Sequence, residues 1–148
     1  MQAVDGDARP AAQVGHVVKR DGSALDAGPV VDMLRGADLD PRAPQPPFKD
    51  LWFRLHGNYR EDPVMNRALL AYVSDFHLVG TAMLPHGISW INTKLMVASL
   101  DHAMWFHRDF RLDDWLLYSC DSPSAYGGRG LSRGSIYDRR GRLVASTA

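Results

Sequence analysis

The sequence has little cysteine, no excess of charge of either sign and no long apolar run, and each absence excludes a class of protein. Cys120 is the single cysteine among the 148 residues, which excludes an intrachain disulfide and a zinc site built from four cysteines. The 17 basic and 17 acidic side chains balance, whereas a protein that coats nucleic acid normally carries a strong positive field. We therefore expect no nucleic-acid partner and a reducing compartment.

Apolar residues occur only in short runs. No stretch approaches the roughly 18 uninterrupted apolar residues that span a bilayer, and the N-terminal sequence MQAVDGDARPAAQ lacks the apolar centre of a signal peptide. We therefore expect a soluble protein that is not exported and has no membrane partner.

Aromatic residues are absent from the first third of the chain. All 14 lie at or after Phe48, and residues 1–47 instead hold 8 Ala, 7 Asp, 6 Pro and 5 Gly. Such a segment buries too little apolar surface to offset the entropy lost on ordering. We interpret residues 1–47 as a poorly structured N-terminal segment that ends in a Pro-rich linker, and residues 48–148 as the folded domain. An alternative stays open, in which residues 30–35 form a short docking helix.

The predicted domain begins with a strand and a long helix. Residues 51–56 alternate bulky apolar side chains with polar ones, which is typical of a strand. Asp62 and Pro63 form a typical helix start, and we expect the helix to run to about Phe76. Its buried side is predicted from two stripes at helical spacing: Met65, Leu69, Tyr72 and Phe76, and beside them Val64, Ala68, Ala71 and Asp75.

Four strand-like runs follow a predicted loop over residues 84–93. They cover residues 94–107, 115–120, 131–137 and 142–147, and their short connections favour antiparallel pairing. Residues 138–141 are expected to form a hairpin turn, and the Gly-rich residues 122–130 a flexible turn. One helix against one face of a five-stranded antiparallel sheet is an α+β arrangement, which leaves an edge or face open for dimerisation.

Polar residues are dense in the apolar run of residues 97–107. A strand there would place Ser99, Asp101 and His107 on one face and His102 on the other. Because the two histidines are five apart on opposite faces, we predict no metal site, and no motif indicates a cofactor. These polar groups are interpreted either as satisfied structural groups or as functional ones.

Asp75 is expected near Ser99 if the helix crosses the sheet. A carboxylate and a hydroxyl that converge can hold and deprotonate a water molecule, which is general-base hydrolysis without a covalent intermediate. The other interpretation, a carboxylate paired with a neighbouring donor, stays open.

Several blocks together resemble a known family. They are AYVSDF at residues 71–76, LPHG at 84–87, ASLDHAMWFHR at 98–108, WLLY at 115–118, and residues 122–131. In this order and spacing they resemble the C-terminal half of the type II acyl-CoA thioesterases, the TesB family. The resemblance covers nearly all of residues 48–148. It implies a hotdog fold, in which a curved antiparallel sheet of about five strands wraps one long helix, as the C-terminal half of a double hotdog.

The resemblance also implies hydrolysis of acyl-CoA to free fatty acid and CoA by an activated water. The family's catalytic carboxylate falls on Asp75 and its hydroxyl on Ser99. Its third catalytic residue, a glutamine, follows the last strand in the family, whereas this sequence stops at Ala148, so we expect impaired activity. The family's N-terminal hotdog is likewise not seen in residues 1–47.

Two other functions remain as alternatives at this point. One is a catalytically weak hotdog module that dimerises and binds acyl-CoA, and the other is a hotdog dehydratase. The expected partners are the acyl-CoA substrate and a second copy of the chain, joined through hotdog sheets. The resemblance implies a role in fatty acid metabolism, and because members of the family occur in the bacterial cytoplasm and in peroxisomes, we expect a cytoplasmic location or, alternatively, a peroxisomal one. The C-terminal residues 146–148 are not the Ser-Lys-Leu peroxisomal address.

Overall fold

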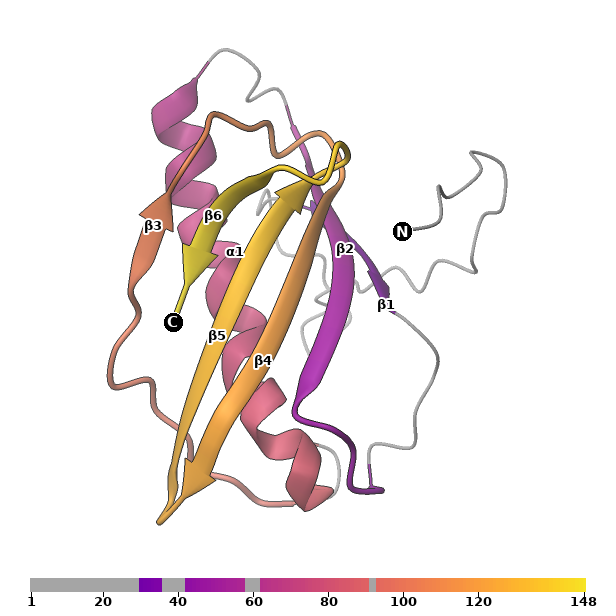
Figure 1. Ribbon diagram of the computed structural model, residues 1–148, viewed down its shortest axis with the longest axis vertical. Helices are drawn as coiled ribbons and strands as arrows, with labels where there is room; N and C mark the ends of the chain where they lie inside the picture. The colour runs from indigo at the N-terminus through magenta and orange to yellow at the C-terminus, as the bar shows by residue number, and fades with distance from the viewer. Residues whose placement is uncertain (1–29, 36–41, 58–61, 91–92) are drawn as a thin grey trace, which may run out of the picture.

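The computed structural model describes residues 30–35, 42–57, 62–90 and 93–148 of the chain. A single long helix crosses one face of a curved, six-stranded antiparallel sheet (Figure 1). The strands are β1 (Val30–Arg35), β2 (Phe48–His56), β3 (Met104–Phe106), β4 (Leu116–Tyr126), β5 (Arg129–Asp138) and β6 (Leu143–Thr147), in the spatial order β1-β2-β4-β5-β6-β3. This layering confirms the predicted α+β class, and a helix wrapped by a curved sheet is the hotdog fold.

Residues 30–35 form a strand, so the alternative prediction of a docking helix there is wrong. β1 pairs with β2 from Val30 opposite His56 to Arg35 opposite Leu51. A six-residue helix would have to bear the cost of nucleation by itself, whereas the extended segment gains backbone hydrogen bonds from a neighbouring strand. The remainder of the predicted N-terminal segment up to residue 41 lies outside the described residues.

The helix α1 (Pro63–Met83) begins where the sequence predicts and ends later. Asp62 caps it by accepting a hydrogen bond from the Met65 N–H at 2.9 Å, with Pro63 in the first turn. α1 continues seven residues beyond Phe76, because the chain meets its next proline only at position 85. The 3₁₀ helix η1 (Leu84–His86) then leads to Gly87, whose φ of 60° suits glycine.

The face of α1 that packs on the sheet differs from the predicted one. Tyr72 and Phe76 are 59% and 45% exposed, and Asp75 is exposed as well, so the predicted burial of these residues is wrong. Leu69 of the first stripe is partly buried and packs against the core. The buried residues are Asn66, Leu70, Val73, Ser74, His77, Leu78, Thr81 and Ala82. Their polar members are accommodated by hydrogen bonds within the helix and to distant segments: the Ser74 hydroxyl donates to the Ala71 carbonyl at 2.9 Å and also lies 3.1 Å from Nε2 of His102.

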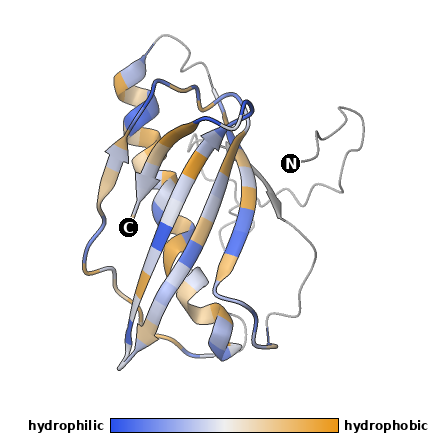
Figure 2. Ribbon diagram, viewed as in Figure 1, coloured by the Kyte–Doolittle hydropathy of each residue, from blue (hydrophilic) through white to orange (hydrophobic). Residues whose placement is uncertain are grey.

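The core lies between α1 and alternate residues of the strands. Leu51, Phe53 and Leu55 are at most 2% exposed, which confirms the predicted alternation in β2, and Figure 2 shows both hydrophobic and hydrophilic segments along β2, β4 and β5. Tyr118 of β4 is fully buried and its hydroxyl donates to the Ser74 carbonyl at 2.9 Å. A Cβ on Gly134 would lie 2.2 Å from a ring carbon of Tyr118, so glycine is what lets the ring lie there.

The two hairpins differ in how well the sequence predicted them. The turn after Asp138 is confirmed: the Asp138 carboxylate accepts hydrogen bonds from the N–H groups of Arg140 and Arg142, and Gly141 has a φ of 74°. The prediction of a flexible turn over residues 122–130 is wrong, because β4 continues to Tyr126 and the turn consists of Gly127 and Gly128. A register shift between Asp121 and Ser124 takes up Pro123, which lacks a donor for the ladder.

The long strand predicted over residues 94–107 is mostly wrong. Only Met104–Phe106 forms β3, which pairs with β6, and the backbones of Ala103 and Ala148 then bond to each other at 2.8 and 3.0 Å. Before Ala103, no strand of the described chain lies alongside to provide backbone partners. The segment of residues 93–103 is therefore irregular, and the predicted alternation of its side chains between two faces does not apply.

One helix among the described residues is long and apolar enough, by length and composition alone, to cross a membrane. It is Pro63–His86, with a mean hydropathy of 1.2. The central helix of a globular domain passes the same test, and α1 packs against β4 and β5. We therefore assign it to the core.

Candidate active site

The two residues that the sequence singled out lie beside the same cavity. This cavity has a volume of about 470 Å³ and lies between the middle of α1 and the irregular segment before β3. α1 contributes Ala71, Tyr72, Asp75 and Phe76, and the segment contributes Ser99, Leu100, Asp101 and His102. Residues 24 positions apart in the sequence thus meet here.

Asp75 and Ser99 are both exposed to the solvent of this cavity. Within the described part of the chain, neither the carboxylate nor the hydroxyl forms a hydrogen bond with another residue. The structure therefore does not show the paired carboxylate that the sequence left open as an alternative. A free carboxylate and a free hydroxyl on one cavity leave their lone pairs and the O–H proton available to a water molecule or a ligand.

His102 ties the irregular segment to the fold. Its Nε2 atom lies 3.1 Å from the Ser74 hydroxyl and 3.1 Å from the Thr147 hydroxyl. Ser74 precedes Asp75 on α1, and Thr147 belongs to β6. His102 therefore fixes the segment that carries Ser99 against the helix turn that carries Asp75.

Sequence reasoning missed the positioning role of His102. The predicted strand separated His102 from Ser99 and Asp101, whereas all three line this cavity. A signal was available in the sequence, because polar residues cluster in an apolar run without a partner strand of matching length. No glutamine from the described residues lines the cavity, so the third catalytic residue implied by the resemblance is not part of it.

The buried Tyr118 of β4 contacts the turn of α1 that carries Ser74 and Asp75. Burial raises the pKa of Tyr118, with further contributions from Cys120 and the Asp75 carboxylate, so the hydroxyl stays protonated and keeps its bond to the Ser74 carbonyl. Burial likewise raises the pKa of the Cys120 thiol to about 11. Cys120 is therefore a protonated core residue at neutral pH rather than a nucleophile.

A serine-hydrolase arrangement is not supported by the fold. The sequence Gly130-Leu131-Ser132-Arg133-Gly134 has the Gly-x-Ser-x-Gly pattern of such enzymes, but it lies inside β5. A nucleophile of that class needs a sharp turn between a strand and a helix that exposes its hydroxyl. The Ser132 hydroxyl is instead buried and has no hydrogen-bond partner within the described part of the chain.

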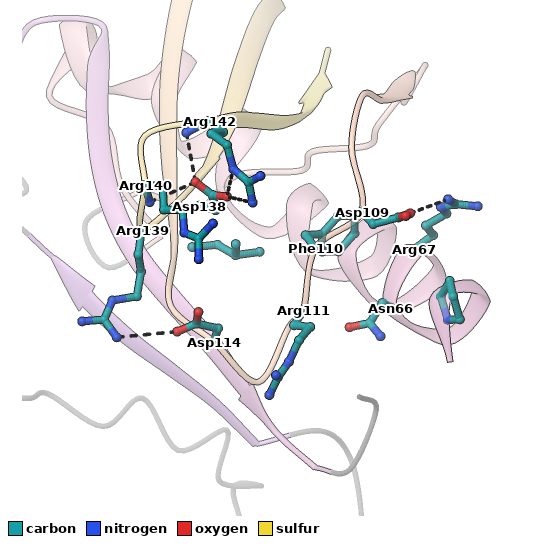
Figure 3. Close-up of a pocket in the computed structure, with 12 residues that line it drawn as sticks. Asn66, Arg67, Asp109, Phe110, Arg111, Asp114, Asp138, Arg139, Arg140 and Arg142 are labelled. Carbon is teal, nitrogen blue, oxygen red and sulfur yellow. Dashed lines mark hydrogen bonds and ion pairs between the residues drawn. The ribbon is translucent and has the colours of Figure 1, made fainter. Parts of the chain in front are cut away.

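A second cavity, of about 450 Å³, lies at the start of α1 and is rich in charge. Figure 3 shows the side chains of Asp138 and Arg142 on one side of it and those of Asp109 and Arg67 on the other. Its charged lining residues are Arg67, Asp109, Arg111, Asp114, Asp138, Arg139, Arg140 and Arg142. We name it the arginine cavity.

Known proteins are similar in sequence to this domain. The sequence model of the family described as Acyl-CoA thioesterase matches residues 45–148. Acyl-CoA thioesterase 2 of Haemophilus influenzae is 43% identical over 96 residues, which are 65% of this chain and 34% of that protein. Acyl-coenzyme A thioesterase 8 of Homo sapiens is 43% identical over 103 residues, which are 69% of this chain and 32% of that protein. The chain thus spans about a third of the length of these curated relatives.

Solved structures share the fold. The acyl-CoA thioesterase II TesB2 from Mycobacterium marinum aligns with a TM-score of 0.66 at 37% identity, over 98% of this chain and 56% of that chain. The zebra fish thioesterase superfamily member 2, at 13% identity and a TM-score of 0.56 over 79% of this chain and 76% of that chain, has a similar fold. With the matched family model, the identities and the shared architecture together, this chain belongs to the acyl-CoA thioesterase family.

Proposed function

We propose that this protein hydrolyses acyl-CoA thioesters to a free fatty acid and CoA, with Asp75 as the general base and Ser99 as the group that positions the water. One observation carries the proposal: the Asp75 carboxylate and the Ser99 hydroxyl line the same cavity, and neither forms a hydrogen bond with another described residue. Membership of the acyl-CoA thioesterase family supports the substrate class.

In this mechanism, the Asp75 carboxylate accepts a proton from the bound water as its oxygen attacks the thioester carbonyl carbon. The Ser99 hydroxyl holds the water by one hydrogen bond. The water is therefore already oriented, and little further entropy is lost when it attacks. The C–S bond of the tetrahedral intermediate then breaks, and the departing CoA sulfur takes up a proton. One water is consumed, and one carboxylic acid and one thiol are formed.

The test is thiol release from a series of saturated acyl-CoA substrates by purified protein. Asp75→Asn is expected to lower turnover by about 10²- to 10⁴-fold, because it removes the base and leaves the shape unchanged. Ser99→Ala is expected to lower it by roughly 10- to 100-fold, because a misplaced water costs about that much. Asp50→Asn, which changes an exposed carboxylate on β2 far along the sheet from the cavity, serves as the matched control.

The outcomes test the two residue roles and distinguish hydrolysis from binding without turnover. Unchanged turnover in Asp75→Asn would remove Asp75 from the mechanism, and unchanged turnover in Ser99→Ala would remove Ser99. Acyl-CoA binding by calorimetry without thiol release from the unaltered protein would contradict hydrolysis and leave the alternative of a binding module.

We propose in addition that a second copy of this chain covers the apolar surface around the cavity. The large exposed apolar residues that line it are Tyr72, Phe76 and Leu100, and Val64 and Met65 on α1 and Trp105 and Phe106 on β3 are exposed as well. β3 also leaves one edge without a neighbour in the described sheet, and such an edge favours pairing with another strand. The aligned TesB2 chain has 44% of its length beyond the match, which is room for a further covering unit in that relative.

The mass in solution tests this second proposal. Light scattering during size-exclusion chromatography is expected to give twice the 16.5 kDa of the chain. The substitution Phe106→Asp places a charge among these exposed apolar residues and is expected to shift the protein towards the monomer. A monomer in the unaltered protein at micromolar concentration would contradict self-association.

A further inference from the structure

The arginine cavity contains one guanidinium group more than the neighbouring carboxylates of the described residues neutralise. Four ion pairs involve its arginines: Arg67 with Asp109, Arg111 with Asp113, Arg139 with Asp114, and Arg142 with Asp138. The guanidinium group of Arg140 is the fifth, and it has no carboxylate partner among the described residues. Among the described residues, the positive charge of Arg140 is therefore uncompensated.

Arg140 is presented by a stiff turn. The Asp138 carboxylate accepts hydrogen bonds from the backbone N–H groups of Arg140, at 3.0 Å, and of Arg142, at 2.9 Å. The Nε atom of Arg142 donates to the same carboxylate at 2.7 Å. A turn held at this many points loses little further entropy when its arginine side chain binds a ligand.

The paired arginines retain the capacity to bind an anion. The side chains of Arg67, Arg111 and Arg142 are 47%, 49% and 52% exposed. A guanidinium group has five N–H donors, and one carboxylate uses at most a few of them. Their ion pairs hold these groups in place around the cavity, where the remaining donors match the oxygens of phosphate in geometry and charge.

The position of this cavity relative to Asp75 suits one class of ligand. Arg67 and Asp75 lie eight residues apart on α1, which corresponds to about 12 Å along the helix axis. Tyr72 lies between them along α1 and is exposed, and Phe106 of β3 stacks on Phe110 of the arginine cavity. A ligand that spans the two cavities would be anionic at one end, less polar in its middle and reactive at the other end.

From this arrangement we propose that the arginine cavity binds the phosphate groups of the CoA portion of the substrate, with Arg140 as its principal contact. The pantetheine arm then crosses the apolar side chains, and the thioester reaches Asp75 and Ser99. The assignment rests on the proposed thioesterase function and adds to it the site that recognises the nucleotide end. It also predicts that binding weakens as salt concentration rises.

The test compares ligands that differ only at the phosphate end. Isothermal titration calorimetry is carried out with CoA, 3′-dephospho-CoA, pantetheine and inorganic phosphate on the full chain. Arg140→Ala is expected to weaken CoA binding by about three- to tenfold, the range for an exposed hydrogen bond to a charged group, and Arg140→Glu is expected to weaken it more. Pantetheine binding is expected to stay unchanged in both variants.

Arg129→Ala is the matched control, because Arg129 is an exposed arginine beside the β4–β5 turn, at the other end of β5 from Asp138. In kinetics, Arg140→Ala is expected to raise the KM for acyl-CoA, leave kcat unchanged and leave hydrolysis of the matching acyl-pantetheine unaffected.

The results separate this proposal from the proposed function. If no thioester is hydrolysed, the thioesterase proposal fails, while calorimetry with CoA still reports on the arginine cavity. If hydrolysis occurs and Arg140→Glu binds CoA as tightly as the unaltered protein, the phosphate assignment alone is overturned. Equal binding of CoA and pantetheine by the unaltered protein, or binding of inorganic phosphate as tight as that of CoA, would overturn it as well.

Discussion

The two faces of α1 each depart from the usual arrangement of a helix on a sheet, because polar residues are mixed into the buried face and large apolar residues stand on the exposed one. The buried face includes Asn66, Ser74 and Thr81, whereas the face away from the sheet carries Met65, Tyr72 and Phe76. The buried polar atoms find hydrogen-bond partners, so their burial costs little. The exposed aromatic residues Tyr72 and Phe76 pack edge to face on each other, 4.9 Å apart.

This difference teaches where stability and function lie on the same helix. The inward face fixes α1 against the sheet through Leu70, Val73 and the bonded polar groups. The outward face holds Asp75 and borders both cavities. Substitutions on the inward face should therefore change the free energy of unfolding, and those on the outward face should change binding and turnover.

The largest change in stability is expected from Leu70→Ala. Leu70 is fully buried, so its truncation removes apolar contacts and leaves a cavity, at a cost of about 2–5 kcal/mol. Tyr72→Ala, two residues further on the outward face, should cost less than about 1 kcal/mol. Urea denaturation of both variants checks this, and equal losses would contradict the assignment of the faces.

Asn66→Ala is the next in size. The Asn66 side chain donates to the Asp62 carbonyl and accepts from the Leu112 N–H, both at 2.9 Å, and it is 3% exposed. Its removal leaves a buried donor unsatisfied and should cost about 1–3 kcal/mol. The neighbouring variant Arg67→Ala breaks only an exposed ion pair, which is worth about 0–1 kcal/mol. A smaller loss for Asn66→Ala than for Arg67→Ala would count against a structural role for Asn66.

A tenfold effect on turnover is expected from His102→Ala. Without its contacts to the Ser74 and Thr147 hydroxyls, the segment that carries Ser99 is no longer fixed, and misplacement of the water lowers kcat by roughly tenfold. CoA affinity, measured by calorimetry, should not change. His102→Gln keeps hydrogen-bonding groups and should recover part of kcat, while His86→Ala, at an exposed site on η1, is the control. Equal kcat in His102→Ala and the unaltered protein would rule out the positioning role.

The smallest effect concerns pH and the turn beside the arginine cavity. Burial alone would raise the pKa of Asp138, but hydrogen bonds from Arg142 and Arg140 hold that pKa below its ordinary value of 3.8. Because the folded pKa is the lower one, the stabilisation is fully present above pH 3.8 and is lost as the pH falls below that value. Thermal unfolding of the unaltered protein and Asp138→Asn should converge in Tm as the pH is lowered through this window. A constant difference would show that the carboxylate charge contributes nothing.

Much of the fold could be predicted from the sequence because local signals agree with it. The cap at Asp62, the alternation in β2 and the turn closed by Gly141 each depend on neighbouring residues only. The buried face of α1 could not be predicted from apolarity, because the hydrogen bonds that permit Asn66 and Ser74 to be buried come from distant segments. The extent of β3 depends in the same way on the length of its partner β6.

The candidate site was predictable in part. Asp75 and Ser99 were named on motif position, and the structure places both on one cavity. The role of His102 depends on Thr147 of β6, 45 residues later, and the arginine cavity unites three separate segments of the chain. The spacing of residues along the sequence contains no information on contacts between such distant segments.

The most direct test of the whole account is a paired measurement of Tm and acyl-CoA turnover on two adjacent residues, Ser74 and Asp75. Ser74 is fully buried and bonded, and Asp75 is exposed and unbonded to other described residues. Ser74→Ala should lower Tm, because it removes a buried hydroxyl with its hydrogen bonds. Asp75→Asn should keep the Tm of the unaltered protein and lower turnover by about 10²- to 10⁴-fold. Full turnover in Asp75→Asn would contradict the account.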